Sequence, residues 1–436
     1  MDIDGVMRSK SRAGTGLPSS RANEARASAR TTHSAPAASR ELSISPFRSP
    51  ARPAVFVSGG EGGYRNTRRA LSNIDLSPAK GKRVILKPNA GRIAPRRGGV
   101  TVDPDVVAAA VDAFLEAGAE VAVGESPIVS VSTMEAFEQA GIADVARERG
   151  CRLIDMDERE YVPVSLPEGI AITNLKVCPE VLEYDIIVSI PVMKMHMHTG
   201  VSLAVKNMKG CLWRRSKVDL HMLPPAKGSE EKSLDIAIAD MSGVLRPHLA
   251  IIDGTTGMEG LGPSAGKAKP ANIIVVSADA FAADAVACRL MGTKADDIPH
   301  LRMGAERGYG VIDVGRITVR PDNWEDFVSP FEPPPSDLAV EFPQITILDE
   351  NSCSACQSTL FLFLRRYGEK IFEYFPPDTR PRIAIGKGHE SLEPGTLCVG
   401  NCTAKHKKDG IFVPGCPPVA SEILNALSTE ERRNKA

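Results

Sequence analysis

The stretch that decides the fold is residues 103–126, which read DPDVVAAAVDAFLEAGAEVAVGES. Asp103 and Pro104 suit the cap and first turn of a helix, and Gly118 suits its end. The residues that follow, 120–123, form an apolar run typical of a buried strand. The stretch therefore predicts one helix followed by one strand.

The same alternation continues on both sides of this unit. Further strands are predicted near 84–86, 152–155, 185–190, 249–253 and 272–277, and further helices near 134–149 and 279–291. Repeated strand–helix units with near-continuous apolar strands predict a mostly parallel sheet with helices on both faces. We therefore expect an α/β fold for the larger part of the chain.

Composition divides the chain into five parts. Residues 1–52 are rich in Ser, Ala and Arg without apolar periodicity, which predicts a disordered tail, with a transit peptide or a start codon placed too early as alternatives. An α/β domain over 53–328 is followed by a proline-rich linker over 329–339. We expect a smaller α/β domain that bears cysteines over 340–430 and a second disordered tail over 431–436.

Bulk composition argues against several classes of protein. The net charge is −1, which gives no sign of nucleic-acid binding, and no apolar run approaches the roughly 18–20 residues of a membrane span. Five of the 9 cysteines lie after residue 350, and no export signal is recognisable. Clustered cysteines in a reducing compartment usually bind metal. We therefore expect a cytoplasmic metal protein that binds neither nucleic acid nor a membrane.

The late cysteines follow predicted strands. Cys402 and Cys416 each come just after a short apolar run, and the segments that carry them align residue for residue. Cys353 and Cys356 follow a third such run. Parallel strands place their carboxyl ends at one edge of a sheet, so four thiols from three loops could meet at one point.

The spacing of these cysteines favours an iron–sulfur cluster. Zinc sites usually present two close cysteine pairs, whereas here one pair is followed by two single cysteines. Cys416 precedes Pro417, a step familiar from iron–sulfur loops, and residues 413–418 resemble the cluster loop in the small iron–sulfur subunit of respiratory complex I. Cys398 is excluded from the predicted ligands because it is expected inside its strand. The alternatives to an iron–sulfur cluster are a structural zinc site and a thiol redox pair. The predicted ligands of a [4Fe–4S] cluster are Cys353, Cys356, Cys402 and Cys416.

A second set of candidate residues follows the strand predicted near 185–190. Residues 194–210 read KMHMHTGVSLAVKNMKG, in which two histidines stand two positions apart. Such histidines point to the same side of an extended chain and could bind a metal or an anion, unless the segment is only a solvated polar loop. The candidates in this block are His196, His198, Lys206 and Asn207.

Lys87 and Asn89 follow another predicted strand. Cationic groups at two strand ends converge on one edge of a parallel sheet, which suits an anionic substrate or a phosphate. Residues 251–263, IIDGTTGMEGLGP, add Asp253 and Glu259 as general bases or cation ligands, unless Asp253 only caps a turn.

These stretches together resemble the domain-of-unknown-function 362 family over about residues 53–320. The motifs that carry the likeness are Lys87-Pro88-Asn89, Gly124-Glu125-Ser126-Pro127, the block 194–210, residues 253–263 and residues 279–287. Members are often described as iron–sulfur proteins, commonly with an attached ferredoxin-type module. This chain lacks the paired cysteine runs of that module and has its own cysteine domain instead.

The block 194–210 also resembles part of the nickel-dependent lactate racemase family. That likeness implies substrate- or cofactor-facing roles for His198 and Lys206. Leu203 and Ala204 stand where that family has a second glycine pair.

The sequence thus predicts an iron–sulfur redox protein of the reductase type that holds a small anionic or phosphorylated substrate. A protein such as a ferredoxin is the expected electron donor. A non-redox, metal-dependent isomerase or racemase with a structural zinc domain, and a non-catalytic iron–sulfur carrier, are the alternatives. The predicted catalytic residues are Lys206, His198, His196 and Asp253, and the predicted binding residues are Lys87, Asn89, Asn207 and Glu259.

Overall fold

The computed structural model describes residues 44–47, 52–129, 131–226, 228–334, 344–352, 354–377 and 379–435. Only a few residues of the predicted N-terminal tail are therefore described. Among them, Phe47 packs on Phe114 with the ring centroids 6.1 Å apart. This short part of the predicted tail is held against the large domain.

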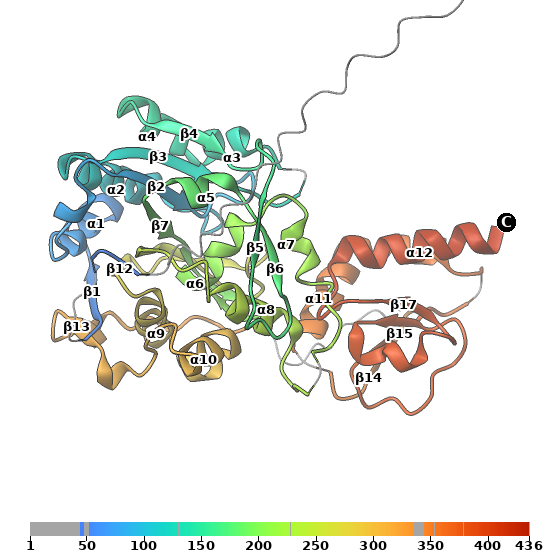
Figure 1. Ribbon diagram of the computed structural model, residues 1–436. Helices are drawn as coiled ribbons and strands as arrows, with labels where there is room; N and C mark the ends of the chain where they lie inside the picture. The colour runs from blue at the N-terminus through green and yellow to red at the C-terminus, as the bar shows by residue number, and fades with distance from the viewer. Residues whose placement is uncertain are drawn as a thin grey trace, which may run out of the picture. The chain divides into compact units, whose positions relative to one another are not determined.

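An 11-stranded sheet forms the centre of the large domain (Figure 1). Its main path runs β13-β1-β12-β10-β7-β2-β3-β4. Outside this path, β8 and β11 each pair with β10, and β9 pairs with β8. A separate two-stranded sheet joins β5 and β6. The strands are β1 (Ala54–Gly59), β2 (Arg83–Pro88), β3 (Glu120–Glu125), β4 (Arg152–Asp155), β5 (Val162–Ser165), β6 (Asn174–Val177), β7 (Ile186–Ile190), β8 (Val192–His196), β9 (Gly200–Ser202), β10 (Leu249–Glu259), β11 (Lys267–Lys269), β12 (Ile273–Ser277) and β13 (Thr318–Arg320).

Parallel pairing dominates the main path of the sheet. Strands β10, β7, β2, β3 and β4 are each parallel to the next, and only β12 runs antiparallel, between β10 and β1. The predicted α/β fold with a mostly parallel sheet is confirmed. Because β2 and β7 are neighbours, the segments that follow them leave the same edge of the sheet.

Both faces of this sheet are buried. In β2, Val84 and Leu86 belong to one hydrophobic cluster, whereas Ile85 between them belongs to the other. A strand covered on both sides has no polar face, which explains its near-continuous apolar sequence. The covering helices of the large domain are α1 (Gly63–Leu71), α2 (Pro104–Glu116), α3 (Thr133–Ala140), α4 (Ile142–Glu148), α5 (Pro179–Glu183), α6 (Ala204–Asn207), α7 (Ser216–Asp219), α8 (Ser233–Met241), α9 (Ala280–Leu290) and α10 (Pro299–Glu306).

Two predicted elements differ from the structure. The helix expected near 134–149 is two helices, α3 and α4, because Gly141 between them has φ 75° and breaks the helical path. The strand expected near 249–253 continues as β10 to Glu259, since its later residues pair with β8 and β11. Most of the glycine-rich stretch 251–263 therefore belongs to this strand.

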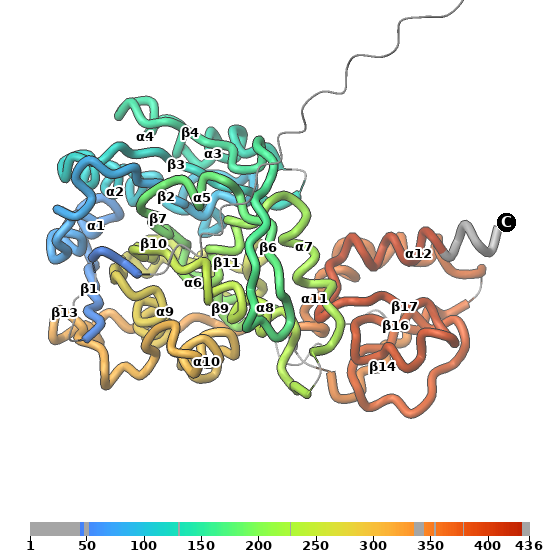
Figure 2. The backbone as a smooth tube through the Cα atoms, viewed as in Figure 1, coloured from blue at the N-terminus to red at the C-terminus, as the bar shows by residue number. Residues whose placement is uncertain are grey.

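The C-terminal part has its own parallel sheet, in the order β14-β15-β16-β17 (Figure 2). The equivalence of the last two cysteine segments is confirmed, because Leu397 pairs with Ile411 and Val399 with Val413. The sequence analysis missed β15, which carries no cysteine. The elements are β14 (Thr346–Asp349), α11 (Ser354–Tyr367), β15 (Arg382–Ile385), β16 (Leu397–Val399), β17 (Ile411–Val413) and α12 (Ala420–Lys435).

Two predicted irregular segments are partly ordered. The start of the proline-rich linker packs on the large domain, where Phe331 is buried and its N–H donates to the carbonyl of Met291. Most of the predicted C-terminal tail belongs to α12, which extends to Lys435. Within the described ranges, no helix is long and apolar enough to cross a membrane.

Candidate functional site

Lys87, at the end of β2, is engaged by protein groups. Its Nζ donates to Glu125 Oε2 at 2.8 Å and to Asn207 Oδ1 at 3.0 Å. A Cβ at Gly210 would lie 2.4 Å from Glu125 Oε1 and 2.6 Å from Lys87 Nζ, so glycine is required where the chain passes this ion pair. Lys87 and Asn207 therefore join the two strand ends, and neither is left open for a ligand.

Lys194 also joins the segments that follow β2 and β7. Its Nζ donates to Asn89 Oδ1 at 2.7 Å and to the carbonyl of Val100. Burial first, and then the positive charges of Lys206 and Arg92, lowers the pKa of Lys194 to about 7. The predicted convergence of the segments after β2 and β7 is confirmed by these contacts.

Within the block 194–210, Lys206 and Lys209 are the lysines that protein groups leave unused. Among the described residues, neither ammonium group has a hydrogen-bond or ion-pair partner. Protein surrounds both side chains, yet each remains partly accessible, so water reaches them. Burial lowers the pKa of Lys206 to about 8, and burial together with Lys206 lowers the pKa of Lys209 well below its usual range.

Three histidine rings border these lysines. The ring centroids of His196 and His198 are 5.4 Å apart, and those of His198 and His221 are also 5.4 Å apart. Burial first, and then the positive charge of the lysines, lowers the pKa of all three rings, that of His198 to about 3. The imidazoles are therefore neutral, and the positive charge of the site belongs to the lysines.

The histidines also contact the cysteine-bearing part of the chain. His198 Nε2 lies 2.8 Å from Thr359 Oγ1, on α11. The backbone N–H of Cys416 donates to the carbonyl of His221 at 2.8 Å. Thr359 stands one turn after Cys356, so the two share a face of α11. Two segments that carry predicted cluster ligands therefore contact His198 and His221.

The two predicted acidic residues point elsewhere. Asp253 Oδ2 accepts the N–H of Asp103 at 2.7 Å, and Oδ1 accepts the N–H of Thr255 at 2.9 Å. Burial raises the pKa of Asp253 to about 6. Glu259 Oε2 accepts the N–H of Glu332 at 3.1 Å. The geometry favours the turn-capping interpretation of Asp253 and gives Glu259 a similar local partner.

The cysteine loops lie together at the carboxyl edge of the small sheet. The N–H of Asn401 donates to the carbonyl of Gly415 at 2.8 Å, which joins the loops after β16 and β17. Gly400 has φ 92°, and a Cβ there would lie 3.2 Å from Cys356 Sγ. The end of β16 therefore passes directly against Cys356, at the start of α11.

Cys353 lies outside the described residues, and the other three predicted ligands fall within them. Cys356 is buried, Cys416 is half-buried and Cys402 is exposed. Within those ranges, no group of three or more His, Cys, Asp or Glu side chains is arranged to hold a metal ion. The predicted four-cysteine set is thus incomplete in the described part of the chain and remains a prediction.

Sequence reasoning missed His221 and Thr359. Thr359 is 161 positions from its partner His198, and no local pattern marks either residue. Asp284, which no sequence pattern marked as part of a site, accepts the N–H groups of Ala204 and Val205 next to Lys206. Only the tertiary contacts identify these three residues as parts of the site.

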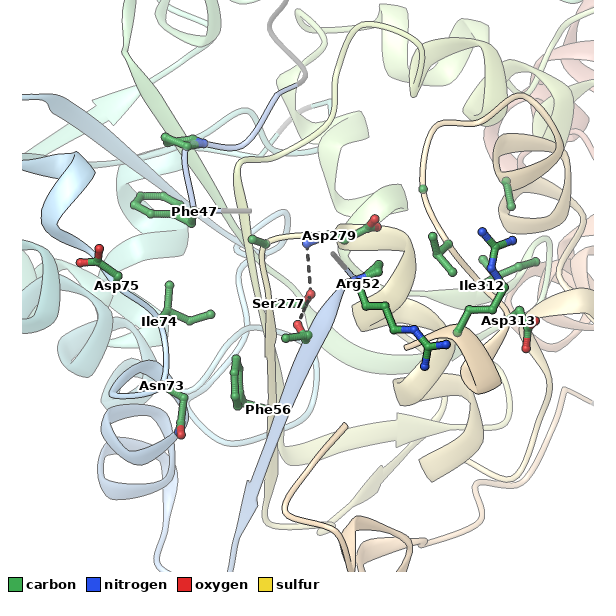
Figure 3. Close-up of a pocket in the computed structure, with 18 of the residues that line it drawn as sticks. Phe47, Arg52, Phe56, Asn73, Ile74, Asp75, Ser277, Asp279, Ile312 and Asp313 are labelled. Atoms are coloured by element: carbon green, nitrogen blue, oxygen red, sulfur yellow. Dashed lines mark hydrogen bonds between the residues drawn. The ribbon is translucent and has the colours of Figure 1, made fainter. Parts of the chain in front are cut away.

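An open pocket of about 1050 Å³ lies near the start of β1 and the end of β12 (Figure 3). Phe47, Phe56 and Asp279 are among the residues that line it, and the N–H of Asp279 donates to Ser277 Oγ. None of the predicted site residues lines it. The pocket is therefore separate from the lysine–histidine site.

Fold and site together define an α/β protein with a small parallel sheet that bears cysteines, and with half-buried lysines at its strand ends that have no partner among the described residues. Residues 84–289 match the family model described as Domain of unknown function (DUF362), which confirms the resemblance predicted from the sequence. All of the predicted large-domain site residues lie within the matched range.

Two known proteins are similar to this chain. The thylakoid-associated protein sll1697 of Synechocystis sp. is 27% identical over 233 residues, which are 53% of this chain and 69% of that protein. The structure of the lactate racemase apoprotein from Thermoanaerobacterium thermosaccharolyticum superposes with a TM-score of 0.37 and 14% identity, over 79% of this chain and 70% of that one. A likeness of this extent gives no basis for transferring site residues.

Proposed function

We propose that this protein is an iron–sulfur redox enzyme of the reductase type that acts on a small anionic or phosphorylated substrate. The observation that supports it most is the contact between the two candidate sites. His198 Nε2 lies 2.8 Å from Thr359 Oγ1, and the N–H of Cys416 donates to the carbonyl of His221. A group held by the cysteine loops would adjoin a substrate held by the lysines.

Lys206 and Lys209 are the proposed anion ligands. A lysine ammonium group without a carboxylate partner is costly inside a protein unless an anion compensates it, and a bound anion would favour the charged form of both side chains. Lys87 and Lys194 differ, because Glu125 and Asn89 already engage them. Neutral His196 and His198 would border the substrate and could donate or accept one hydrogen bond each.

The cysteine loops would hold the cluster. Cys356 lies in the first turn of α11, whereas Cys402 and Cys416 follow β16 and β17. Gly400 leaves room for Cys356 Sγ. Four thiolates would suit a [4Fe–4S] cluster, with Cys353, which lies outside the described residues, as the fourth ligand. When bound, such a cluster supplies or accepts single electrons. The proposal therefore requires an external electron donor, for which a ferredoxin is the expected class.

Metal content tests the redox part of the proposal. Protein purified without oxygen should contain about four irons and as many acid-labile sulfides per chain. Cys402→Ser and Cys416→Ser should each lose them. Cys398→Ser is the matched control, since Cys398 lies inside β16 and its thiol donates to the carbonyl of Thr396. One zinc and no iron would refute the redox part and favour a non-redox enzyme.

Anion binding tests the substrate part. Sulfate is a useful probe because it stays dianionic at all relevant pH values, and calorimetry at constant ionic strength measures its affinity. Lys206→Met should weaken binding roughly tenfold or more, because a hydrogen bond to a charged group contributes about 1.5–3 kcal/mol. The exposed Lys82→Met is the control. Equal affinities in the two variants would refute a role of Lys206 in anion binding.

A further inference from the structure

Asp284 is a buried carboxylate whose two oxygens both serve another segment. It lies on α9 and is 0% exposed. Oδ1 accepts the N–H of Ala204 at 2.7 Å, and Oδ2 accepts the N–H of Val205 at 2.9 Å. These two amides form the first turn of α6, which lies 80 residues earlier in the chain.

Nothing else accounts for a charge at this position. Among the described residues, no ammonium or guanidinium group pairs with Asp284. Burial raises its pKa to about 8, whereas the two N–H donors favour the ionised form. Burying a carboxylate without a cation is costly unless hydrogen bonds compensate it. The two amide contacts are therefore the feature that distinguishes Asp284 from an ordinary core residue.

The turn that Asp284 holds is the one that carries Lys206. Helix α6 has 4 residues, which is too short to be stable by itself. Its last residue, Asn207, bonds to Lys87 and so ties the turn to β2. The first turn is held by Asp284 and the last residue by Lys87. Lys206 stands between these two fixed points.

We infer that Asp284 is a positioning residue that holds the Lys206 ammonium group in the anion site through the backbone of α6. The inference rests on the proposed anion-binding role of Lys206. The N–H groups of the first turn of a helix have no acceptor within that helix, and in α6 the side chain of Asp284, from another helix, supplies the acceptors. Without it, the turn would open and Lys206 would move into solvent.

Asp279 provides a matched control. It lies five positions earlier, and its Oδ1 accepts the N–H groups of Phe281 and Ala282 at the start of its own helix. Asp279→Asn and Asp284→Asn make the same change in the same region. Asn keeps one carbonyl oxygen, which is enough for the Asp279 cap, whereas Asp284 uses both of its oxygens as acceptors and loses one of them. Only Asp284 contacts the turn that carries Lys206.

The test measures the titration of each lysine by acetylation with limiting acetic anhydride at a series of pH values and peptide mass spectrometry. In the wild type and in Asp279→Asn, Lys206 should titrate near its lowered pKa of about 8. In Asp284→Asn it should titrate at an ordinary lysine pKa of about 10.4. Sulfate affinity should fall roughly tenfold or more in Asp284→Asn and stay within about twofold in Asp279→Asn.

A second variant decides the matter if Asp284→Asn does not fold. Ala204→Pro removes one of the two N–H donors and keeps Asp284, and proline is tolerated at the first position of a helix. Its effect on Lys206 should match that of Asp284→Asn. Unchanged titration of Lys206 in the Asp284 variant, or in Ala204→Pro alone, would overturn the inference. If the wild type binds no sulfate but Lys206 titrates as expected, the proposed function fails while the positioning role stands.

Discussion

The buried pair of Lys87 and Glu125 gives the prediction that the structure specifies most closely. Both side chains are 2% exposed, and Lys87 Nζ lies 2.8 Å from Glu125 Oε2. Glu125→Gln keeps the shape of the side chain and leaves the ammonium group without its counter-charge. Breaking a buried pair by removing one partner costs about 3–5 kcal/mol. We expect the free energy of unfolding of the large domain to fall by that amount.

Urea denaturation followed by tryptophan fluorescence measures this loss. The 2 tryptophans, Trp213 and Trp324, both belong to the large domain, so the signal reports that domain. Glu116→Gln is the control, because its partner Arg68 lies at the surface and 62% of the Glu116 side chain is exposed. An exposed pair is worth about 0–1 kcal/mol.

Equal losses in Glu125→Gln and Glu116→Gln would refute the structural role given to Lys87. The double variant Lys87→Met with Glu125→Gln adds a second check, since removing both charges should recover part of the stability. If Lys87 were instead an anion ligand, Glu125→Gln would raise sulfate affinity by freeing its ammonium group. We expect no such gain, because Asn207 still engages Lys87.

Two further predictions concern the two sites. Sulfate affinity should fall about tenfold per pH unit above the lowered pKa of Lys206, which is about 8. The anion needs the ammonium form of Lys206, which is present below that pKa and lost above it. Constant affinity up to about pH 10 would contradict the site. Gly400→Ala should lower the iron content of the purified protein, because the new Cβ would lie 3.2 Å from Cys356 Sγ. Gly395→Ala is the control, since Gly395 also has a positive φ but a Cβ there would have no atom within 4 Å. Equal iron content in both variants would contradict the arrangement of the cysteine loops.

Local sequence patterns were sufficient for the elements of the fold. The apolar runs 84–86 and 185–190 mark strands that are buried on both faces, and the structure places both in one parallel sheet. The residue-for-residue alignment of the segments that carry Cys402 and Cys416 predicted the register of β16 and β17, in which Cys398 pairs with Phe412. Gly141 shows the limit of such patterns, because a periodic apolar face continues across a glycine that ends one helix and begins the next.

By itself, the sequence determined the α/β fold, the two domains' order and the strand ends at which lysines, histidines and cysteines stand. Tertiary structure alone decided which of these groups are still available. Lys87 is neutralised by Glu125, which lies 38 positions away, whereas Lys206 has no such partner among the described residues. Periodicity reports the face on which a side chain lies. The partner of a buried charge depends on which distant segments the order of strands in the sheet brings together. Local sequence patterns do not predict that order.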